Sequence, residues 1–196
     1  MKHLLQSYLT ELRSGHQDYT TEHYCFRQFV KADAHPLFAA SQNPQFNKFL
    51  LWSQPPSVAA EMVQIKKLIR EDTINESVTF SVVEKVTGKW VGFVRWIPYQ
   101  DGLAGTLWLH PDYWGTGAVN ELNDALFAIV FLIVEVPSLY IFIQPANTPM
   151  VRIAQKKGMK ELNMMDLVHE DGTPRTVQVY HVARGMWENR SELSTF

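Results

Sequence analysis

The sequence has little of what marks several common protein classes. It contains one cysteine, Cys25, so an internal disulfide is excluded, and this suits the reducing cytoplasm in which we expect the protein. Its formal net charge is only −2, which gives no sign of the basic patch that contacts nucleic-acid phosphates. We therefore expect no nucleic-acid partner.

The chain also lacks a hydrophobic run long enough to cross a bilayer. The longest run, 125–134, reads ALFAIVFLIV, which is too short for a transmembrane helix and predicts a buried one. Residues 1–15 lack the apolar segment and small-residue cleavage site of a signal peptide. Their leucines recur at helical spacing, which predicts an amphipathic helix docked on the core or on a neighbouring subunit. We expect no membrane partner.

Metal-ligand patterns are missing as well. The seven histidines show no spacing with one another, with the cysteine or with carboxylates that would hold a metal ion, so we predict no metal. Hydrophobic residues are plentiful. They make up 46% of the chain and charged residues make up 19%, which is the mix of an ordinary globular domain. A chain of 196 residues suffices for one such domain with a substantial core.

The order of the predicted elements favours an α+β domain. Strands alternate in part with helices and in part with hairpin turns, which indicates a mixed sheet. We expect an N-terminal amphipathic arm over 1–20, a single domain over 21–188 and a C-terminal tail over 189–196. The predicted strands are 23–30, 78–84, 89–97, 103–109, 139–144, 160–168 and 176–183, and the predicted helices are 33–41, 57–70, 117–134 and 148–157.

Residues 107–120, LWLHPDYWGTGAVN, carry the strongest functional signal. An apolar strand runs into Pro111, and a short loop with Gly115 and Gly117 then opens a long apolar helix. Glycines let backbone amides approach an anion, and the first turn of a helix leaves N–H groups free at the positive end of its dipole. The pattern predicts a pocket for a phosphate, and hence a cofactor that carries a pyrophosphate.

Two familiar phosphate loops fit these residues poorly. A nucleoside-triphosphate loop needs a lysine after its last glycine, and none follows Gly117. The dinucleotide fingerprint needs a third glycine, where this chain has Asn120. A nucleotide-binding protein is therefore the weakest of the readings kept open.

The remaining pattern resembles the pyrophosphate loop of the GNAT superfamily of acetyl-CoA-dependent N-acetyltransferases. Its usual form is [Q/R]-x-x-G-x-[G/A] directly after a strand, and residues 112–117 match it except for Asp112. The stretch 110–117 is similar to the H-P-[E/D]-Y-[R/W]-G-x-G of the ribosomal-protein N-terminal acetyltransferase-like branch. Residues 139–159 resemble the family's element N-x-x-S-x-R-x-x-E-K-x-G-F after a strand. There Asn147, Arg152, Lys156 and Gly158 match, while Met150, Gln155 and Met159 depart.

The resemblance implies a GNAT-like acyl-CoA N-acyltransferase fold. Such a fold has a central mixed, mostly antiparallel sheet with flanking helices and two parallel strands, ending here near Leu109 and Gln144, that splay apart. The pantetheine arm of acetyl-CoA, the implied co-substrate, enters the gap between them. The cofactor-binding residues implied are Leu107, Trp108 and Leu109 through their backbone, the amides of Trp114, Gly115, Thr116, Gly117, Ala118 and Val119 around the pyrophosphate, and Asn147.

Two of these roles have open alternatives. Asn147 contacts the pantetheine arm, or it is only the N-cap of the next helix. By family analogy the Leu109 N–H polarises the thioester carbonyl, although a plain core strand would have the same side chains.

The catalytic base is left open. His110 ends the cofactor strand and titrates in a useful range, yet the His-Pro pair is also a structural element of this branch. Glu121, in the first turn of the helix, is a base or a carboxylate that complements the helix dipole. Glu84 and Asp101, near strand ends, are further candidates. The tyrosine that often protonates the leaving thiolate in this family is absent, and Ala154 stands in its place.

The resemblance implies an acyltransferase that moves the acetyl group of acetyl-CoA to a primary amine by direct attack in a ternary complex. The branch favours a protein N-terminal α-amine, while polyamines, aminoglycosides and amino-acid derivatives stay open as acceptors. The missing tyrosine keeps an alternative open, a non-catalytic acyl-CoA-binding regulatory module. We expect the aromatic-rich segment 42–57, with Trp52, to line the acceptor groove. The N-terminal and apolar helices are compatible with a homodimer.

Overall fold

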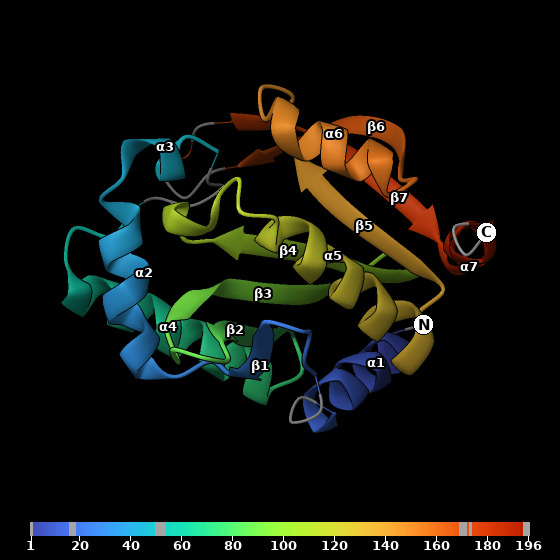
Figure 1. The fold of residues 1–196 in the computed structure, drawn as a ribbon. Helices are drawn as coiled ribbons and strands as arrows, with labels where there is room; N and C mark the ends of the chain where they lie inside the picture. The colour runs from blue at the N-terminus through green and yellow to red at the C-terminus, as the bar shows by residue number, and fades with distance from the viewer. Residues whose placement is uncertain (1, 16–18, 50–53, 169–171, 173, 194–196) are drawn as a thin grey trace.

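The computed structural model describes residues 2–15, 19–49, 54–168, 172 and 174–193, and within them one seven-stranded sheet has helices on both faces (Figure 1). The order across the sheet is β1-β2-β3-β4-β5-β7-β6, and only β4 and β5 are parallel neighbours. The mixed, mostly antiparallel sheet expected from the sequence is thus confirmed. The strands are β1 Tyr24–Gln28, β2 Val78–Glu84, β3 Trp90–Tyr99, β4 Gly102–Leu109, β5 Ser138–Ile143, β6 Lys160–Val168 and β7 Pro174–Ala183.

Adjacent residues of a central strand pack into two separate hydrophobic layers, one on each face of the sheet. Phe93 and Val94 are neighbours on β3 and therefore point to opposite faces of the sheet. Val94 packs in the larger core with α1, α5 and α6, and Phe93 packs with α2, α3 and α4. The helices are α1 Lys2–Ser14, α2 Ala34–Ser41, α3 Pro44–Asn47, α4 Val58–Thr73, α5 Ala118–Ala128, α6 Thr148–Lys156 and α7 Arg184–Leu193.

The N-terminal helix belongs to the core of its own chain. Leu5, Leu9 and Leu12 lie on one face of α1 and are buried, the last two completely. Arg13, at the end of the helix, donates to the Asn75 side chain at 2.6 Å. Of the two dockings expected for this arm, the structure shows the one on the core.

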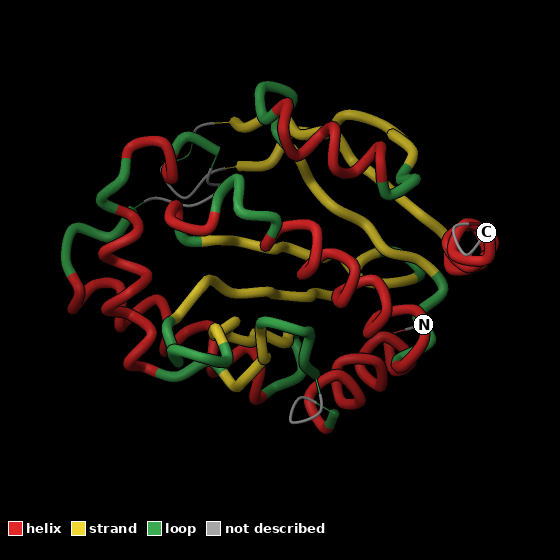
Figure 2. The backbone as a smooth tube through the Cα atoms, viewed as in Figure 1, coloured by secondary structure: helices red, strands yellow, loops and turns green. Residues whose placement is uncertain are grey.

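The apolar segment after the glycine loop forms one continuous helical stretch in two parts (Figure 2). α5 ends at Ala128, and a π-helical segment, Ile129–Ile133, follows, in which the Val134 amide bonds to the Ile129 carbonyl at 3.0 Å. The π-helical segment was not expected, because the spacing of hydrophobic residues cannot distinguish it from an α-helix. No helix in the described ranges is long and apolar enough to span a membrane.

The C-terminal helix was not expected either. α7 runs through Leu193, so it continues beyond residue 188, where we placed the end of the domain. Its signal in the sequence is weak because few of its residues are apolar. Trp187 supplies the anchor, with its ring 5.4 Å from that of Phe131 and 6.5 Å from that of Phe127.

A buried carboxylate ties β1, β2 and the start of α2 together. Asp33 stands directly before α2, but its side chain makes no cap hydrogen bond to that helix. Instead its two oxygens accept from the Arg27 guanidinium at 2.5 and 2.9 Å, from the Val30 amide at 2.9 Å and from the Ser81 hydroxyl at 2.6 Å. Four donors satisfy a charge that would otherwise be costly to bury.

This arrangement predicts a large loss of stability in Asp33→Asn. Removing the charge leaves the Arg27 guanidinium without its bidentate partner, which should lower the free energy of unfolding by about 3 kcal/mol. Urea denaturation would measure it. The control is Asp124→Asn, which breaks the exposed pair with Lys157 and should cost less than about 1 kcal/mol. Equal losses in the two variants would contradict the role given to Asp33.

Candidate functional site

The two parallel strands part soon after they meet. β4 and β5 pair only at Leu103–Leu139 and Ala104–Tyr140, close to their first residues. Beyond Ala104 the strands diverge, and Figure 1 shows the gap opening toward the loops at the ends of β4 and β5. The splayed pair predicted from the resemblance is therefore present.

The backbone of β4 presents polar groups to this gap. The His110 amide donates to the Val91 carbonyl on β3 at 2.7 Å. Because N–H groups along a strand point alternately to its two sides, the amides of Leu109 and Leu107 point away from β3 and toward the gap. The Leu109 carbonyl points the same way and accepts from the Trp114 indole nitrogen at 3.1 Å. In the described part of the chain no strand lies there to pair with these amides.

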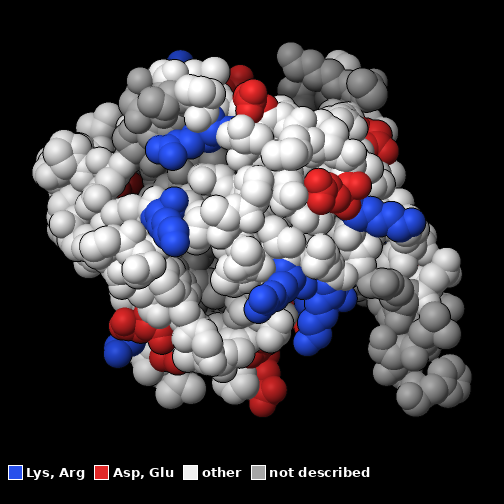
Figure 3. Space-filling view, turned by 90° about the horizontal axis from the view of Figure 1, so that it is seen from above, with Lys and Arg blue, Asp and Glu red and all other residues white. Residues whose placement is uncertain are grey.

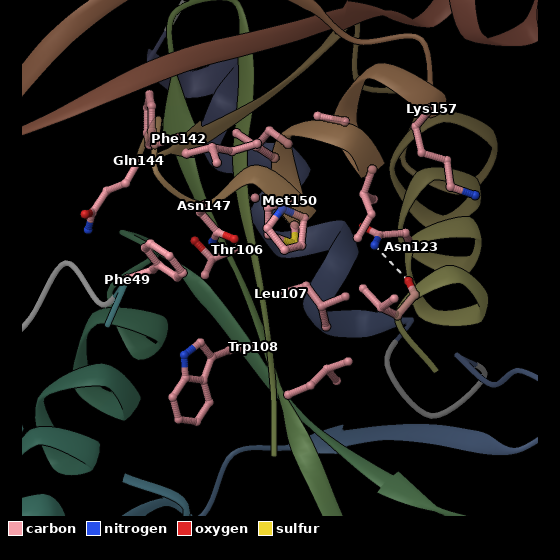
Figure 4. Close-up of a pocket in the computed structure, with 18 of the residues that line it drawn as sticks. Phe49, Thr106, Leu107, Trp108, Asn123, Phe142, Gln144, Asn147, Met150 and Lys157 are labelled. Carbon is pink, nitrogen blue, oxygen red and sulfur yellow. Dashed lines mark hydrogen bonds between the residues drawn. The ribbon is translucent and has the colours of Figure 1, made fainter. Parts of the chain in front are cut away.

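A cavity of about 700 Å³ occupies the gap and reaches through the sheet. Its lining includes both Leu107 and Trp108, whose side chains point to opposite faces because they are neighbours on one strand. Figure 4 shows the two sides: Leu107, Asn123 and Lys157 lie on one side of β4, and Trp108, Phe49 and Gln144 lie on the other. Two molecules approaching from opposite faces would meet at the level of the sheet.

The side toward α5 and α6 is mostly apolar. Asn123 is an exception, and its side-chain nitrogen donates to the Val119 carbonyl at 2.8 Å. Thr148 and Lys157 are others, and Lys157 pairs with Asp124. Ala154, in the position where the family often has a tyrosine, is fully buried. This lining includes Val119, Asn123, Leu126, Phe127, Thr148, Met150, Ile153, Ala154 and Lys157.

The opposite side is an aromatic shelf, by which we mean Phe46, Phe49, Trp108 and Phe142. Phe46 packs edge-to-face on Trp108, and Phe93 lies behind with its ring 5.2 Å from that of Trp108. These contacts fix the indole in one orientation. Polar groups on this side are the side chains of Gln45, Lys48, Thr106 and Gln144.

The glycine loop has the geometry that its sequence predicted. Gly115 and Gly117 have φ values of 74° and 95°, in the left-handed region that favours glycine. The amides of Gly115, Thr116, Gly117 and Val119 have no acceptor within the described residues. They sit at the N-terminus of α5, where the helix dipole favours an anion.

Asn147 is not a side-chain cap. It precedes α6, yet its amide group makes no cap hydrogen bond to that helix. Instead Asn147 lines the cavity, and Figure 4 shows its side chain between Gln144 and Met150. Of the two roles considered for Asn147, the side-chain cap is not formed, and contact with a ligand stays a prediction.

His110 does not line the cavity. Its Nδ1 atom accepts from the Asp112 amide at 3.2 Å, which caps the short helical turn Pro111–Tyr113. The same nitrogen lies 3.5 Å from the Asp112 carboxylate. The arrangement gives His110 a part in shaping the loop.

Glu121 joins the first turn of α5 to the start of β1. Its carboxylate accepts from the His23 amide and contacts the His23 Nδ1 atom, both at 2.9 Å. Burial raises the pKa of Glu121, but hydrogen bonds from Thr21 and from both groups of His23 outweigh it, so the pKa lies below its ordinary value. The hydrogen bond to Glu121 and its charge raise the pKa of His23. Glu121 thus has partners, and they lie outside the cavity.

The two weaker base candidates also have partners elsewhere. Asp101 accepts from Tyr140 at 2.5 Å and from Ser138 at 2.9 Å, at the end of β4 and β5 where the strands still pair. Burial raises the pKa of Asp101, but these two hydrogen bonds hold it below its ordinary value. Glu84 accepts from Thr87 within the β2–β3 turn.

The structure thus gathers most of the predicted cofactor residues and none of the predicted bases. Four predicted cofactor residues of the glycine loop, which stand between Trp114 and Val119, do not line the cavity. No carboxylate or histidine is part of the lining within the described residues. The residues that line the cavity are Leu107, Trp108, Leu109, Trp114, Val119 and Asn147, and the four outside are Gly115, Thr116, Gly117 and Ala118.

Several lining residues were missed. Thr106 lies two residues before Trp108 and Phe142 lies two before Gln144, so the period of two along the predicted strands 103–109 and 139–144 could have placed each pair on one face. Phe46 and Phe49 confirm that the segment 42–57 contributes to the lining. Trp52, singled out in that segment, lies outside the described residues.

Comparison with known proteins agrees with this geometry. Residues 23–160, more than half of the chain, match the family model for the acetyltransferase (GNAT) domain. No curated protein matches in a sequence search.

Three solved structures illustrate the similarity of fold. A Vibrio cholerae protein provisionally assigned as a ribosomal-protein-serine acetyltransferase is 20% identical over 84% of this chain and 96% of its own, with a TM-score of 0.73. A GCN5-related N-acetyltransferase from Brucella melitensis is 18% identical over 87% and 80%, with a TM-score of 0.74. Mutant forms of a Vibrio cholerae spermidine/spermine N-acetyltransferase are 16% identical over 86% and 98%, with a TM-score of 0.67.

The Glu121–His23 pair predicts a pH window of stability. The raised pKa of His23 contributes stability that is present below the ordinary value of 6.5 and is lost as the pH rises through the folded pKa. The lowered pKa of Glu121 contributes stability that is present above the ordinary value of 4.5 and is lost as the pH falls through the folded pKa. The melting temperature of Glu121→Gln should therefore fall below wild type most between about pH 5 and 6.

Thermal unfolding at a series of pH values checks this window. The control is Val86→Thr, which changes a residue 92% exposed in the β2–β3 turn and alters no titratable group. Its difference from wild type should not vary with pH. A Glu121→Gln difference that is as large at pH 9 as at pH 5.5 would contradict the ionic nature of the contact.

Proposed function

The chain belongs to the GNAT acetyltransferase family and is an acyltransferase, and on that premise we propose that it acetylates weakly basic primary amines, above all the N-terminal α-amine of a peptide. GNAT enzymes take the acetyl group from acetyl-CoA and transfer it to an amine. The finer proposal concerns which residues hold the cofactor and which amines are accepted. It rests mainly on the absence of a carboxylate or histidine from the described lining of the cavity.

The residues present fit acetyl-CoA. The amides of Gly115, Thr116, Gly117 and Val119 are free to bind a pyrophosphate at the N-terminus of α5. The gap-facing amides of β4 match the polar groups of pantetheine, in the way that an added strand pairs with a sheet edge. The apolar side chains of α5 and α6 would cover the arm. The cofactor supplies a thioester, and this chain supplies its orientation and a dry environment.

The amine would approach from the side of the aromatic shelf. Its nitrogen attacks the thioester carbonyl, the carbon–sulfur bond breaks, and the proton lost by the nitrogen ends on the thiolate, through water. The Leu109 amide, which points into the gap, is suited to stabilise the negative charge that develops on the carbonyl oxygen. Holding the two reactants together in one cavity removes most of the entropic barrier.

The lining selects for an amine that is already neutral. At pH 7.4 an α-amine with a pKa near 7.8 is about one quarter neutral, while a lysine amine with a pKa near 10.4 is about one thousandth neutral. Without a general base in the lining, the first reacts far more readily. Polyamines have strongly basic amines and gain no attraction here, because the shelf side carries Lys48 and no acidic side chain in its described part.

One protein of similar fold is provisionally assigned as a ribosomal-protein-serine acetyltransferase. The acetyl acceptor of the present chain is proposed on the lining and not on that likeness, since at this identity only the fold is shared.

The cofactor assignment predicts that Gly117→Val weakens acetyl-CoA binding at least about tenfold. A side chain at residue 117 makes the left-handed backbone conformation unfavourable by about 1–2 kcal/mol, and the loop would change its conformation to relieve that strain. Isothermal titration calorimetry measures the affinity. The matched control is Gly88→Val in the β2–β3 turn, where φ is 69° and the strain is similar, but acetyl-CoA affinity should be unchanged.

The acceptor assignment predicts a preference among amines. With saturating acetyl-CoA, thiol release should be at least about tenfold faster with a peptide bearing a free α-amine than with the same peptide N-terminally blocked and carrying one lysine. The rate should rise with pH as the acceptor amine is deprotonated, without a second inflection from the enzyme. Faster reaction with spermidine would overturn the amine preference. Tight acetyl-CoA binding with no thiol release from any amine would instead favour the regulatory module.

A further inference from the structure

The cavity continues past the point where the proposed reaction takes place. In the proposed function the Leu109 amide faces the thioester, yet the lining extends back along β4 as far as Gly105. Four residues of a strand span about 13 Å, and even from the Leu107 amide, the other β4 amide that faces the gap, about 7 Å remain. An acetyl group has one carbon beyond its carbonyl, so it reaches little of this length.

α5 and β5 form walls of the same length as β4. α5 runs back along β4 (Figure 1), and Phe127 lies eight residues beyond Val119, which is about 12 Å along the helix axis. On β5, Ile143, Ile141 and Leu139 alternate along one face, and all three belong to the lining. The cavity is therefore an elongated space between one helix and two strands.

The inner end of this space is closed and apolar. It ends where β4 and β5 begin to pair, at Leu103–Leu139, and Leu103 is fully buried and outside the lining. Charged side chains stay on the outer surface of this part of the molecule, where Figure 3, seen from the side that carries α6, shows them in separate small groups. We call this end the inner pocket, which consists of Trp96, Gly105, Leu126, Phe127, Leu139 and Ile141.

Gly105 keeps the inner pocket open. Its φ does not lie in the left-handed region, so the backbone there does not require glycine. A Cβ atom at this position would lie 3.4 Å from the Leu139 Cδ1 atom and 3.5 Å from the nearest atoms of the Trp96 ring, which are ordinary van der Waals distances. The strand could therefore carry a side chain here, and that side chain would occupy the pocket.

An apolar space of this kind is costly to leave unfilled. Protein interiors are close-packed, because side chains that line a void lose contacts with neighbouring atoms. Water fills such a space poorly, since a buried water molecule needs several polar partners. The indole N–H of Trp96 is the only polar side-chain group among the residues of the inner pocket. The pocket is therefore suited to a hydrocarbon chain.

We propose that the inner pocket binds an acyl chain longer than acetyl, so that butanoyl-CoA and hexanoyl-CoA are donors for the same amine. The inference rests on the proposed function, which supplies the position of the thioester. The reaction is otherwise unchanged: the amine nitrogen bonds to the acyl carbonyl carbon, the carbon–sulfur bond breaks, and the proton lost by the nitrogen ends on the thiolate. Each methylene that moves from water to these apolar walls raises the affinity by up to about fourfold.

Isothermal titration calorimetry with a series of CoA thioesters tests the proposal on the full chain. Hexanoyl-CoA, with four more methylenes than acetyl-CoA, should bind at least about tenfold more tightly. Dodecanoyl-CoA should bind no more tightly than hexanoyl-CoA, because the pocket is closed at its inner end. An affinity that does not rise from acetyl to hexanoyl would mean that the pantetheine arm itself fills the space, and would overturn the proposal. A rise that continues to dodecanoyl would indicate adsorption to the surface and would overturn it as well.

A valine in the pocket should remove this selectivity. In Gly105→Val the ratio of hexanoyl-CoA to acetyl-CoA affinity should fall at least about fivefold, because the side chain takes the place of the added methylenes. The matched control is Gly185→Val on α7, where a Cβ atom meets nothing within 4 Å, and its ratio should equal that of wild type. Equal ratios in the two variants would contradict the assignment of the pocket.

A smaller substitution keeps the test available if valine prevents folding. Gly105→Ala adds one methyl group that its neighbours accommodate, and it should lower the same ratio by a smaller factor. The melting temperature of each variant shows whether it is folded. An unchanged ratio in a folded Gly105→Ala variant, with no lower ratio in Gly105→Val, would overturn the proposal.

Thiol release with a peptide that bears a free α-amine separates this proposal from the proposed function. Release with acetyl-CoA together with an affinity that does not depend on chain length would overturn the longer acyl chain alone. Tighter binding of hexanoyl-CoA with no release from any thioester would overturn the proposed function and leave the pocket assignment in place.

Discussion

The separation of β4 from β5 after two residue pairs is the constraint on which the rest of this molecule depends. Breaking a parallel ladder inside a sheet leaves backbone groups without partners, and in a buried sheet that is costly. The fold tolerates it because Asp101 holds the two strands together at one end while helices and aromatic rings close around the other. The amides of β4 are then available to a ligand, so the break in the sheet coincides with the candidate site.

The two sides of the opening have different chemistry. One is formed by α5 and α6 and is mostly apolar, with free amides at the entrance of α5. The other is aromatic and is held rigid by contacts among Phe46, Phe93 and Trp108. Neither side brings a proton acceptor into the described lining. A site with such a lining offers position and backbone dipoles to a ligand.

The sequence predicted most of the fold, because strands and helices with clear periodicity and strong turn residues define themselves locally. Gly115 and Gly117 are the best example, because the loop has a left-handed backbone conformation at both positions and glycine adopts it most readily. The missed features depend on tertiary contacts. α7 is held by Trp187 against α5 and the π-helical segment, and His110 and Glu121 look like catalytic groups in the sequence until the Asp112 amide and His23 are seen beside them.

The hydrogen bond from the Trp114 indole to the Leu109 carbonyl fastens the glycine loop to the end of β4. That carbonyl points into the gap beside the Leu109 amide, and the indole occupies one of its two lone pairs. A smaller residue at position 114 would lose this tie, so the loop amides and the strand end would no longer be held in a fixed relation.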